Sequence, residues 1–320
     1  MHICVTGSAG FIGFNVARAL LEEGHTVVGV DNFNPYYSVQ LKHDRDAVLR
    51  QYSGYESTNL DLADRERLNA LLAEQRPGAI CHLAAQAGVR YSLTHPFVYG
   101  TANLDAFLNL LEACRHAAPQ PRLVYASSSS VYGGNTKLPF SETDNVDAPV
   151  SLYAATKKAN ELMAHAYSHL YGLQTIGLRF FTVYGPWGRP DMAMWLFTDA
   201  MIHGREIKVF NHGDMRRDFT YIDDIVQGVK ASLFQPDLDR YEIFNLGNHR
   251  SENLMDMIRL LARTVGTEPN MKLLPMQPGD VPATYADIAR ARTRLGFEPA
   301  TPIAEGIPRF VRWFREYHDV

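Results

Sequence analysis

The sequence predicts an α/β protein built on a doubly wound parallel sheet, followed by a smaller mixed region. Through the first half of the chain, short apolar runs rich in β-branched residues alternate with longer amphipathic stretches. That order is typical of parallel strands joined by helices, and right-handed crossovers place the helices on both faces. After about Gly185 prolines become frequent and helical stretches shorten, which indicates a more irregular second region.

The individual elements follow from the length and periodicity of each run. Five apolar runs are short enough to be strands buried on both faces: His2–Thr6, Thr26–Asp31, Ala79–Leu83, Arg122–Ser127 and Thr175–Arg179. Four longer stretches have the spacing of amphipathic helices: Phe11–Glu23, Asp64–Gln75, Phe97–Ala117 and Leu152–Tyr171. We therefore expect one domain over residues 1–185 and a second region over residues 186–320, with room for segments that cross between them.

Composition excludes several classes of protein. The 320 residues are 46% hydrophobic and 21% charged, as in an ordinary globule, and the net charge of −4 argues against general affinity for nucleic acid or anionic lipid. The three cysteines have no metal-ligand spacing, so we expect no disulfide framework, no metal and a reducing compartment. No signal peptide or bilayer-spanning run is recognisable. A cytoplasmic protein is expected, with neither nucleic acid nor membrane as partner.

The first strand leads directly into a glycine turn, Gly7-Ser8-Ala9-Gly10-Phe11-Ile12-Gly13, which opens a helix. This GxxGxxG pattern is a variant of the dinucleotide fingerprint, in which glycines let the backbone approach a pyrophosphate at the positive end of the helix. The second strand ends at Asp31, about where an acid would bind the ribose diol. The alternative is a structural turn with an incidental acid.

Asp31 also indicates which dinucleotide is bound. A carboxylate accepts hydrogen bonds from ribose hydroxyls and repels a 2′-phosphate, and Asn32, Phe33 and Asn34 supply no arginine for that phosphate. NAD is therefore expected rather than NADP. The other expected cofactor contacts follow strand ends: Asn32, Asp61, Leu62, Leu83, Ala84 and Ala85.

Tyr153-Ala154-Ala155-Thr156-Lys157 is a YxxxK motif on a predicted helix, where residues i and i+4 share a face. An ammonium beside a phenol favours the phenolate and lowers its pKa, which makes a general base for a hydroxyl. Four serines, Ser127–Ser130, lie at and just beyond the end of the fourth predicted strand, at the crevice edge of the sheet. They are candidate hydrogen-bond partners for a sugar, or alternatively a solvated loop.

Together the glycine turn, Asp31, the serine-rich segment before Val131-Tyr132-Gly133 and YxxxK resemble the extended short-chain dehydrogenase/reductases, over essentially the whole chain. The resemblance implies a Rossmann sheet and a catalytic triad of Ser128, Tyr153 and Lys157, with Lys157 also binding the nicotinamide ribose.

Two further segments, His82–Ser92 and Leu178–Ala193, resemble nucleotide-sugar epimerases, and most of all UDP-glucuronate 4-epimerases. The segment Arg216–Asp224 resembles the one whose arginine binds the diphosphate, which we assign to Arg217. Lys208-Val209-Phe210 resembles the uracil-binding edge, although Val209 has an equal alternative as a core strand residue. The implied substrate contacts are Arg90, Ser128, Ser129, Ser130, Thr182, Arg189, Val209, Phe210, Arg217 and Asp280.

The resemblance implies NAD-dependent C4 epimerisation of UDP-glucuronate to UDP-galacturonate. Tyr153 takes the proton of the 4-hydroxyl, C4 passes its hydride to tightly bound NAD, and the 4-keto sugar turns before hydride returns to its other face. Dehydratases and decarboxylases of the family carry an acid beside the catalytic Ser or Thr, whereas this chain has Ser129 and Ser130. An epimerase is therefore expected.

The acid sugar is inferred from two residues. Thr182 stands where epimerases of neutral hexoses commonly have Asn, and Arg189 offers charge for a carboxylate that the nearby hydroxyls would also hold. A phosphate contact is the alternative for Arg189. Alternatives for the protein are a neutral UDP-hexose 4-epimerase, a dinucleotide sensor, and a dehydrogenase that releases NADH.

A homodimer is expected as well. The helices over Phe97–Ala117 and Leu152–Tyr171 carry apolar residues on more than one face, and the family resemblance suggests an intersubunit four-helix bundle. The residues that indicate it are Leu104, Phe107, Leu108, Leu111, Leu162, Met163 and Tyr167. Burial of that second face by the C-terminal region is the alternative.

Overall fold

A seven-stranded sheet, parallel throughout, forms the centre of the computed structural model, which describes residues 1–320. The strand order is β11-β6-β5-β4-β1-β2-β3. The strands are β1 (His2–Thr6), β2 (Thr26–Asp31), β3 (Tyr55–Asn59), β4 (Ala79–His82), β5 (Arg122–Ser128), β6 (Thr175–Phe180) and β11 (Tyr241–Leu246). The predicted fold class is confirmed, and the order reverses between β1 and β4, where a doubly wound sheet opens its ligand crevice.

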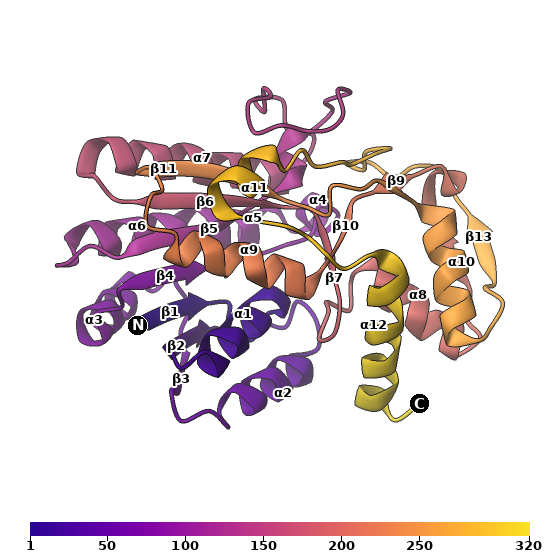
Figure 1. Cartoon of the computed structure of the whole chain (residues 1–320), viewed down its shortest axis with the longest axis horizontal. Helices are drawn as coiled ribbons and strands as arrows, with labels where there is room; N and C mark the ends of the chain where they lie inside the picture. The colour runs from indigo at the N-terminus through magenta and orange to yellow at the C-terminus, as the bar shows by residue number, and fades with distance from the viewer.

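Helices cover both faces of this sheet (Figure 1). One face carries α1 (Phe11–Glu22), α2 (Val39–Leu49) and α9 (Ile222–Phe234), and the other carries α3 (Arg65–Gln75), α6 (Ala106–His116) and α7 (Leu152–Tyr171). Successive strand residues alternate between two cores: Ile3 and Val5 pack on the α1 side, whereas Cys4 packs on the α6 side. This double burial explains why the strand runs are continuously apolar.

The stretch Phe97–Ala117, predicted as one regular helix, is helical but interrupted. It consists of α5 (Pro96–Tyr99), the π-helical segment η1 (Gly100–Asp105) and α6, and it is preceded by α4 (Tyr91–Thr94). The side chain of Asn160, in α7, donates to the backbone carbonyl of Asn103, in η1, at 2.7 Å. The buried Asn103 side chain in turn donates to Gln86 O and Thr156 Oγ1. These tertiary hydrogen bonds account for the local departure from α-helical pairing.

The C-terminal region is built of small elements: β7 (Thr182–Tyr184), α8 (Ala193–Ile202), β8 (Ile207–Val209), η3 (Phe210–Gly213), β9 (Arg216–Arg217), β10 (Phe219–Tyr221), β12 (Glu252–Asn253), α10 (Leu254–Val265), β13 (Met271–Leu273), α11 (Ala289–Leu295) and α12 (Ile303–His318). The short strands pair as β10–β7, β12–β9 and β13–β8. The chain also returns to the large sheet after residue 185, because α9 covers it and β11 is its edge strand beside β6.

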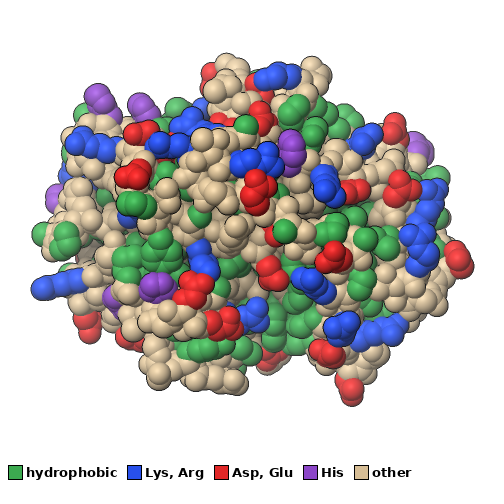
Figure 2. Space-filling view, viewed as in Figure 1, with side chains coloured by type: hydrophobic (Ala, Val, Ile, Leu, Met, Phe, Trp, Pro, Cys, Tyr) green, Lys and Arg blue, Asp and Glu red, His purple; other side chains and the backbone are tan.

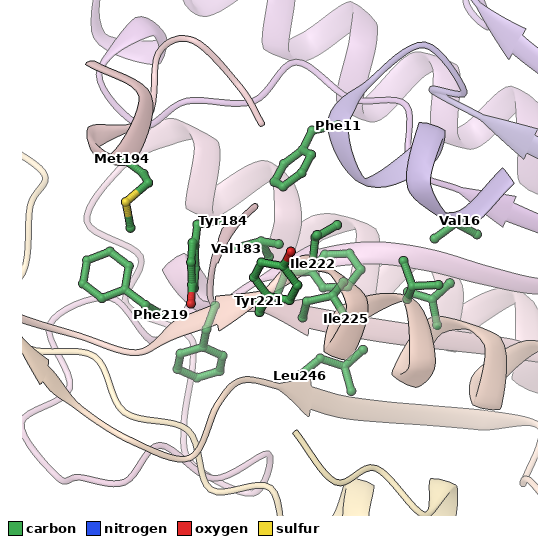
Figure 3. Close-up of a cluster of buried hydrophobic side chains, with 14 of the residues drawn as sticks. Phe11, Val16, Val183, Tyr184, Met194, Phe219, Tyr221, Ile222, Ile225 and Leu246 are labelled. Carbon is green, nitrogen blue, oxygen red and sulfur yellow. The ribbon is translucent and has the colours of Figure 1, made fainter. Parts of the chain in front are cut away.

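One continuous core joins the two regions. Figure 3 shows part of it, where side chains from α1 lie close to others from the C-terminal elements. The labelled members are Phe11, Val16, Val183, Tyr184, Met194, Phe219, Tyr221, Ile222, Ile225 and Leu246. The two regions on either side of the ligand cleft are therefore supported by the same packed core.

The surface carries charges of both signs. On the face viewed in Figure 2, acidic and basic side chains are interspersed between hydrophobic patches. None of the helices is both long enough and apolar enough to cross a membrane.

Candidate active site

A cleft of about 970 Å³ runs along the carboxyl ends of the strands, between the sheet and the C-terminal elements. That volume lies at the upper end of the range for ligand sites. Every residue predicted to bind cofactor or substrate, or to act in catalysis, lines this cleft except Val209. Val209 is the last residue of β8 and is fully buried in the core, so its side chain takes the structural alternative, while Lys208 and Phe210 line the cleft.

The glycine turn needs its glycines because other backbone crowds it. Gly7 has φ +71°, and a Cβ there would lie 2.7 Å from Ala84 N. A Cβ on Gly13 would lie 2.0 Å from Gly7 O. Helix α1 starts after Gly10 with no side-chain cap, so its first N–H groups are left for an anion. The turn therefore has the shape and the donors that a dinucleotide diphosphate requires.

Asp31 lies at the end of β2 and is held in place by the backbone. Its carboxylate accepts from Ala9 N at 3.1 Å and from Phe33 N at 2.8 Å. The sequence analysis missed the buried Lys42, whose Nζ lies 4.0 Å from Asp31 Oδ1 and which also lines the cleft. Burial lowers the pKa of Lys42. The Lys42 ammonium thus lies beside the Asp31 carboxylate, and Lys42 belongs to α2, a helix that was not predicted from the sequence.

The three residues of the implied triad meet at the end of β5. Ser128 ends that strand, and its Oγ accepts from Ser130 N at 3.1 Å. Tyr153 and Lys157 lie one turn apart in α7, which Ser151 caps by accepting from Ala154 N. Lys157 is buried and donates to the carbonyl of Ala126 at 2.9 Å. The i, i+4 spacing therefore does place both side chains on the cleft.

The electrostatics of Tyr153 differ from expectation. Burial raises the pKa of Tyr153, and the opposing effects of hydrogen bonding with Ser128 and of the Arg189 charge are smaller. Burial also lowers the pKa of Lys157 to about 8. Lys157 was expected to lower the phenol pKa, but its ammonium is bonded to the Ala126 carbonyl. The groups that favour the phenolate are the Ser128 hydroxyl first and Arg189 second, and burial outweighs both.

Arg189 belongs to a loop, Gly185–Met192, that connects β7 to α8. Its guanidinium binds both oxygens of Asp191, with Nε 3.0 Å from Oδ1 and Nη2 2.5 Å from Oδ2. Tyr36 OH donates to the same carboxylate at 3.0 Å. Burial opposes ionisation of Asp191, but the guanidinium lowers its pKa overall. The sequence analysis missed both Asp191 and Tyr36, because neither belongs to a motif.

A second group of charges lies at another part of the cleft. Arg90 Nη2 is 3.0 Å from Asp280 Oδ2, and its guanidinium lies 4.7 Å from the Phe210 ring centre. Burial lowers the pKa of Arg217, which also feels the charges of Asp280 and Arg90. Two arginines on one part of the cleft suit a diphosphate. Arg189 is not in this group and pairs with Asp191 instead.

The serines divide into two roles. Ser127 Oγ donates to Glu161 Oε1 at 2.7 Å, inside a buried network in which Arg179 pairs with the same carboxylate. Ser127 is thus structural, although its backbone borders the cleft. Ser128, Ser129 and Ser130 line the cleft, so the solvated-loop alternative does not describe them.

A doubly wound sheet that brings a glycine turn, a ribose acid and a Ser–Tyr–Lys set to one cleft is the arrangement of the extended short-chain dehydrogenase/reductases. The chain belongs to the NAD dependent epimerase/dehydratase family, whose model matches residues 3–247.

Relatives and solved structures narrow the comparison. The chain is 47% identical to UDP-glucuronate 4-epimerase 4 of Arabidopsis thaliana, covering 99% of this chain and 76% of that protein. It is 45% identical to a probable UDP-glucuronate 4-epimerase of Rhizobium meliloti, with 98% and 97% covered. The structure of UDP-glucuronic acid 4-epimerase from Bacillus cereus, in complex with UDP-glucuronic acid and NAD, superposes with a TM-score of 0.94 at 33% identity, covering 99% and 100%.

Proposed function

We propose that this protein catalyses the NAD-dependent C4 epimerisation of UDP-glucuronate to UDP-galacturonate. The observation that carries the proposal is that Arg189 lines the same cleft as Tyr153 and Thr182. A cation there suits a carboxylate on the sugar that Tyr153 deprotonates. The similarity to UDP-glucuronate 4-epimerases over nearly the whole chain supports the same substrate.

NAD fits the residues on the sheet side of the cleft. The glycine turn and the uncapped start of α1 would hold its diphosphate, and Asp31 would accept from the adenosine ribose. Asn32 Nδ2 donates to Asp61 Oδ2 at 3.0 Å, so two expected adenosine contacts support each other. When bound, NAD supplies a reversible hydride acceptor for the sugar C4.

The protein's own groups manage the proton and hold the sugar. Tyr153 Oη accepts the proton of the 4-hydroxyl and later returns it, with the Ser128 hydroxyl as its hydrogen-bond partner. The diphosphate lies between Arg90 and Arg217, and Phe210 borders the base. Because the sugar is oxidised and reduced in turn, no net NADH release is expected.

The same site must retain the carboxylate, since a β-keto acid readily loses carbon dioxide. Hydroxyls of Ser129, Ser130 and Thr182 line the cleft and offer neutral hydrogen bonds. The two residues immediately after Ser128 are serines rather than Asp or Glu, so neither supplies a carboxylic acid to protonate a carbanion. The test is NMR of the products from UDP-glucuronate and from UDP-glucose, and conversion of UDP-glucose alone would contradict the acid-sugar assignment.

Replacing Asp31 with Asn should weaken NAD binding and narrow the preference for NAD over NADP. The ribose loses a charged hydrogen-bond acceptor, which lowers the affinity for NAD about tenfold or more. The repulsion of the 2′-phosphate of NADP also disappears, while the cation Lys42 remains. Affinities for both dinucleotides, measured by calorimetry on nucleotide-free protein, check this. An unchanged ratio of the two affinities would show that Asp31 does not select the cofactor.

We also propose a homodimer formed through α5, α6 and α7. Phe97 is 89% exposed, and Leu108, Leu162 and Leu170 are exposed on the same helices. The C-terminal region leaves these side chains uncovered, so they favour a partner subunit. Of the residues that suggested the dimer, Phe107 and Leu111 instead face the core, and Met163 and Tyr167 are partly buried against it.

Light scattering at micromolar concentration should give twice the 36.0 kDa chain mass. Phe97→Glu with Leu162→Glu should shift the protein to monomer, because a buried unpaired charge is costly at an apolar interface. Met271→Glu is the matched control, since Met271 is exposed on β13, at the opposite end of the molecule from α6 (Figure 1). A monomeric parent protein would end the proposal.

The proposal includes a cytoplasmic location. The three cysteines are buried and unpaired, as suits a reducing compartment.

A further inference from the structure

Arg45 of α2 is a fully buried cation for which no carboxylate serves as a partner. Its side chain has no measurable exposure, and none of the ion pairs in the structure includes it. Its terminal nitrogens donate to neutral oxygens, whereas its buried Nε has no partner. Nη1 lies 2.9 Å from Ala9 O and 3.0 Å from Tyr37 OH, and Nη2 lies 2.6 Å from Trp187 O and 2.9 Å from Gly188 O. A buried charge is expensive unless its surroundings need it.

The oxygens that Arg45 binds belong to the two halves of the active site. Ala9 lies inside the glycine turn, and its N–H donates to Asp31. Trp187 and Gly188 immediately precede Arg189 in the loop Gly185–Met192. One guanidinium therefore joins the turn that would carry the cofactor diphosphate to the loop that carries the charge for the sugar carboxylate.

The loop needs this support because its backbone is unusual. Trp187 has φ +62°, a conformation that a bulky side chain rarely adopts. Its ring is wedged against Phe14 of α1 and Trp313 of α12, with centroids 5.1 and 5.4 Å away. The ring packing fixes the side chain, and the two Arg45 hydrogen bonds fix the carbonyls. These contacts thereby fix the direction of the backbone from Gly188 to Arg189.

The planar guanidinium group of arginine suits this task better than any other side chain. The two terminal nitrogens of an arginine diverge, so each serves one half of the site at the same time. A lysine in the same place has one nitrogen and a flexible stem. It keeps the charge but cannot hold both carbonyl groups in fixed relation.

We propose that Arg45 is a positioning residue that couples the cofactor-binding turn to the Arg189 loop and so sets the selectivity for an acidic sugar. The inference rests on the proposed function, because it assumes that Arg189 binds the substrate carboxylate. Arg45 itself lies behind the cleft wall and acts through Ala9 on one side and through Trp187 and Gly188 on the other.

The experiment compares Arg45→Lys and Arg45→Met with Arg50→Met. Arg50 ends the same helix but is exposed and bonded only to Asp46, so it controls for the loss of an arginine from α2. For each protein we would measure the affinities for UDP-glucuronate and UDP by calorimetry, the NAD that remains after gel filtration, and the thermal midpoint.

Arg45→Lys should lose about ten- to a hundredfold of its affinity for UDP-glucuronate relative to UDP, because misplacing a binding group by about 1 Å has effects of this size. It should also retain less NAD, and Arg45→Met should lose both properties further. Arg50→Met should match the parent protein. If Arg45→Met fails to fold, Arg45→Lys decides the question.

If Arg45 is purely structural, Arg45→Lys should have a lower thermal midpoint, but its NAD content and the ratio of its affinities for UDP-glucuronate and UDP should be unchanged. That result would overturn the proposal. If the parent protein binds UDP-glucuronate no better than UDP, it is the proposed function that fails. The coupling is then judged on NAD retention, and normal retention by Arg45→Lys rejects it.

Discussion

Tyr153→Phe should bind NAD and UDP-glucuronate normally and epimerise at least about 10²–10⁴-fold more slowly, the range for a general acid–base group. The ring packing is kept, because phenylalanine has the same shape without the hydroxyl. What disappears is the phenol hydroxyl, whose hydrogen-bond partner is Ser128. Single-turnover rates with saturating sugar measure the chemical step directly.

Tyr171→Phe is a suitable control for this experiment. Tyr171 ends the same helix, is exposed, and packs its ring beside Tyr167 away from the cleft. It should keep the parent rate. Turnover by Tyr153→Phe close to that of the parent would remove Tyr153 from the mechanism, whatever the control does.

Arg189→Ala should weaken UDP-glucuronate binding by about ten- to a hundredfold relative to UDP, the value of a lost charge-assisted hydrogen bond. The structure adds a second effect. Asp191 is bonded to Arg189 through both oxygens, so removal of the arginine leaves an unpaired carboxylate near the sugar. Repulsion between the two carboxylates should enlarge the loss.

The double variant Arg189→Ala with Asp191→Asn separates these effects, because it removes the arginine and the exposed negative charge together. Calorimetry should show part of the affinity restored. An equal loss of UDP and UDP-glucuronate in Arg189→Ala would assign Arg189 to the diphosphate instead.

Thr182→Ala addresses the fate of the 4-keto acid. Thr182 lines the cleft at the start of β7 and offers one of the neutral hydroxyls for the carboxylate. A carboxylate held less firmly can turn into line for carbon dioxide loss. We expect some UDP-4-keto-pentose and released carbon dioxide from this variant, and none above the parent level would show that the other hydroxyls suffice.

Parts of the fold were predictable because their signals are local. The strand runs were found to within one residue at their ends, since strands buried on both faces must be continuously apolar. Helix α7 was found with its bounds unchanged, because its apolar periodicity starts at a serine cap and ends at Gly172. Two strands of the sheet are not among the five predicted runs. The edge strand β3 is polar and has no fully buried residue, and β11 lies in the proline-rich half of the chain, where no helix–strand alternation marks it.

Helix α2 shows the limit of this reasoning. Its sequence is Val39-Gln40-Leu41-Lys42-His43-Asp44-Arg45-Asp46-Ala47-Val48-Leu49, which is too polar to read as a helix that faces a core. Lys42 and Arg45 are nevertheless buried, and both take partners from distant segments. Burial of charge is decided by those partners, and no pattern within the helix reports them.

The sequence by itself determined the doubly wound sheet, and it predicted the glycine turn and the Tyr153–Lys157 pair. These depend on apolar periodicity and on spacings within a single element, whereas the place of Ser128 in the triad came from the family resemblance. The tertiary structure decided which charges meet which groups: Lys157 donates to the Ala126 carbonyl, Asp191 holds Arg189, and Val209 is buried in the core. Such pairings depend on how loops from separate strands meet across the cleft, and electrostatic effects follow distance in space rather than distance along the chain.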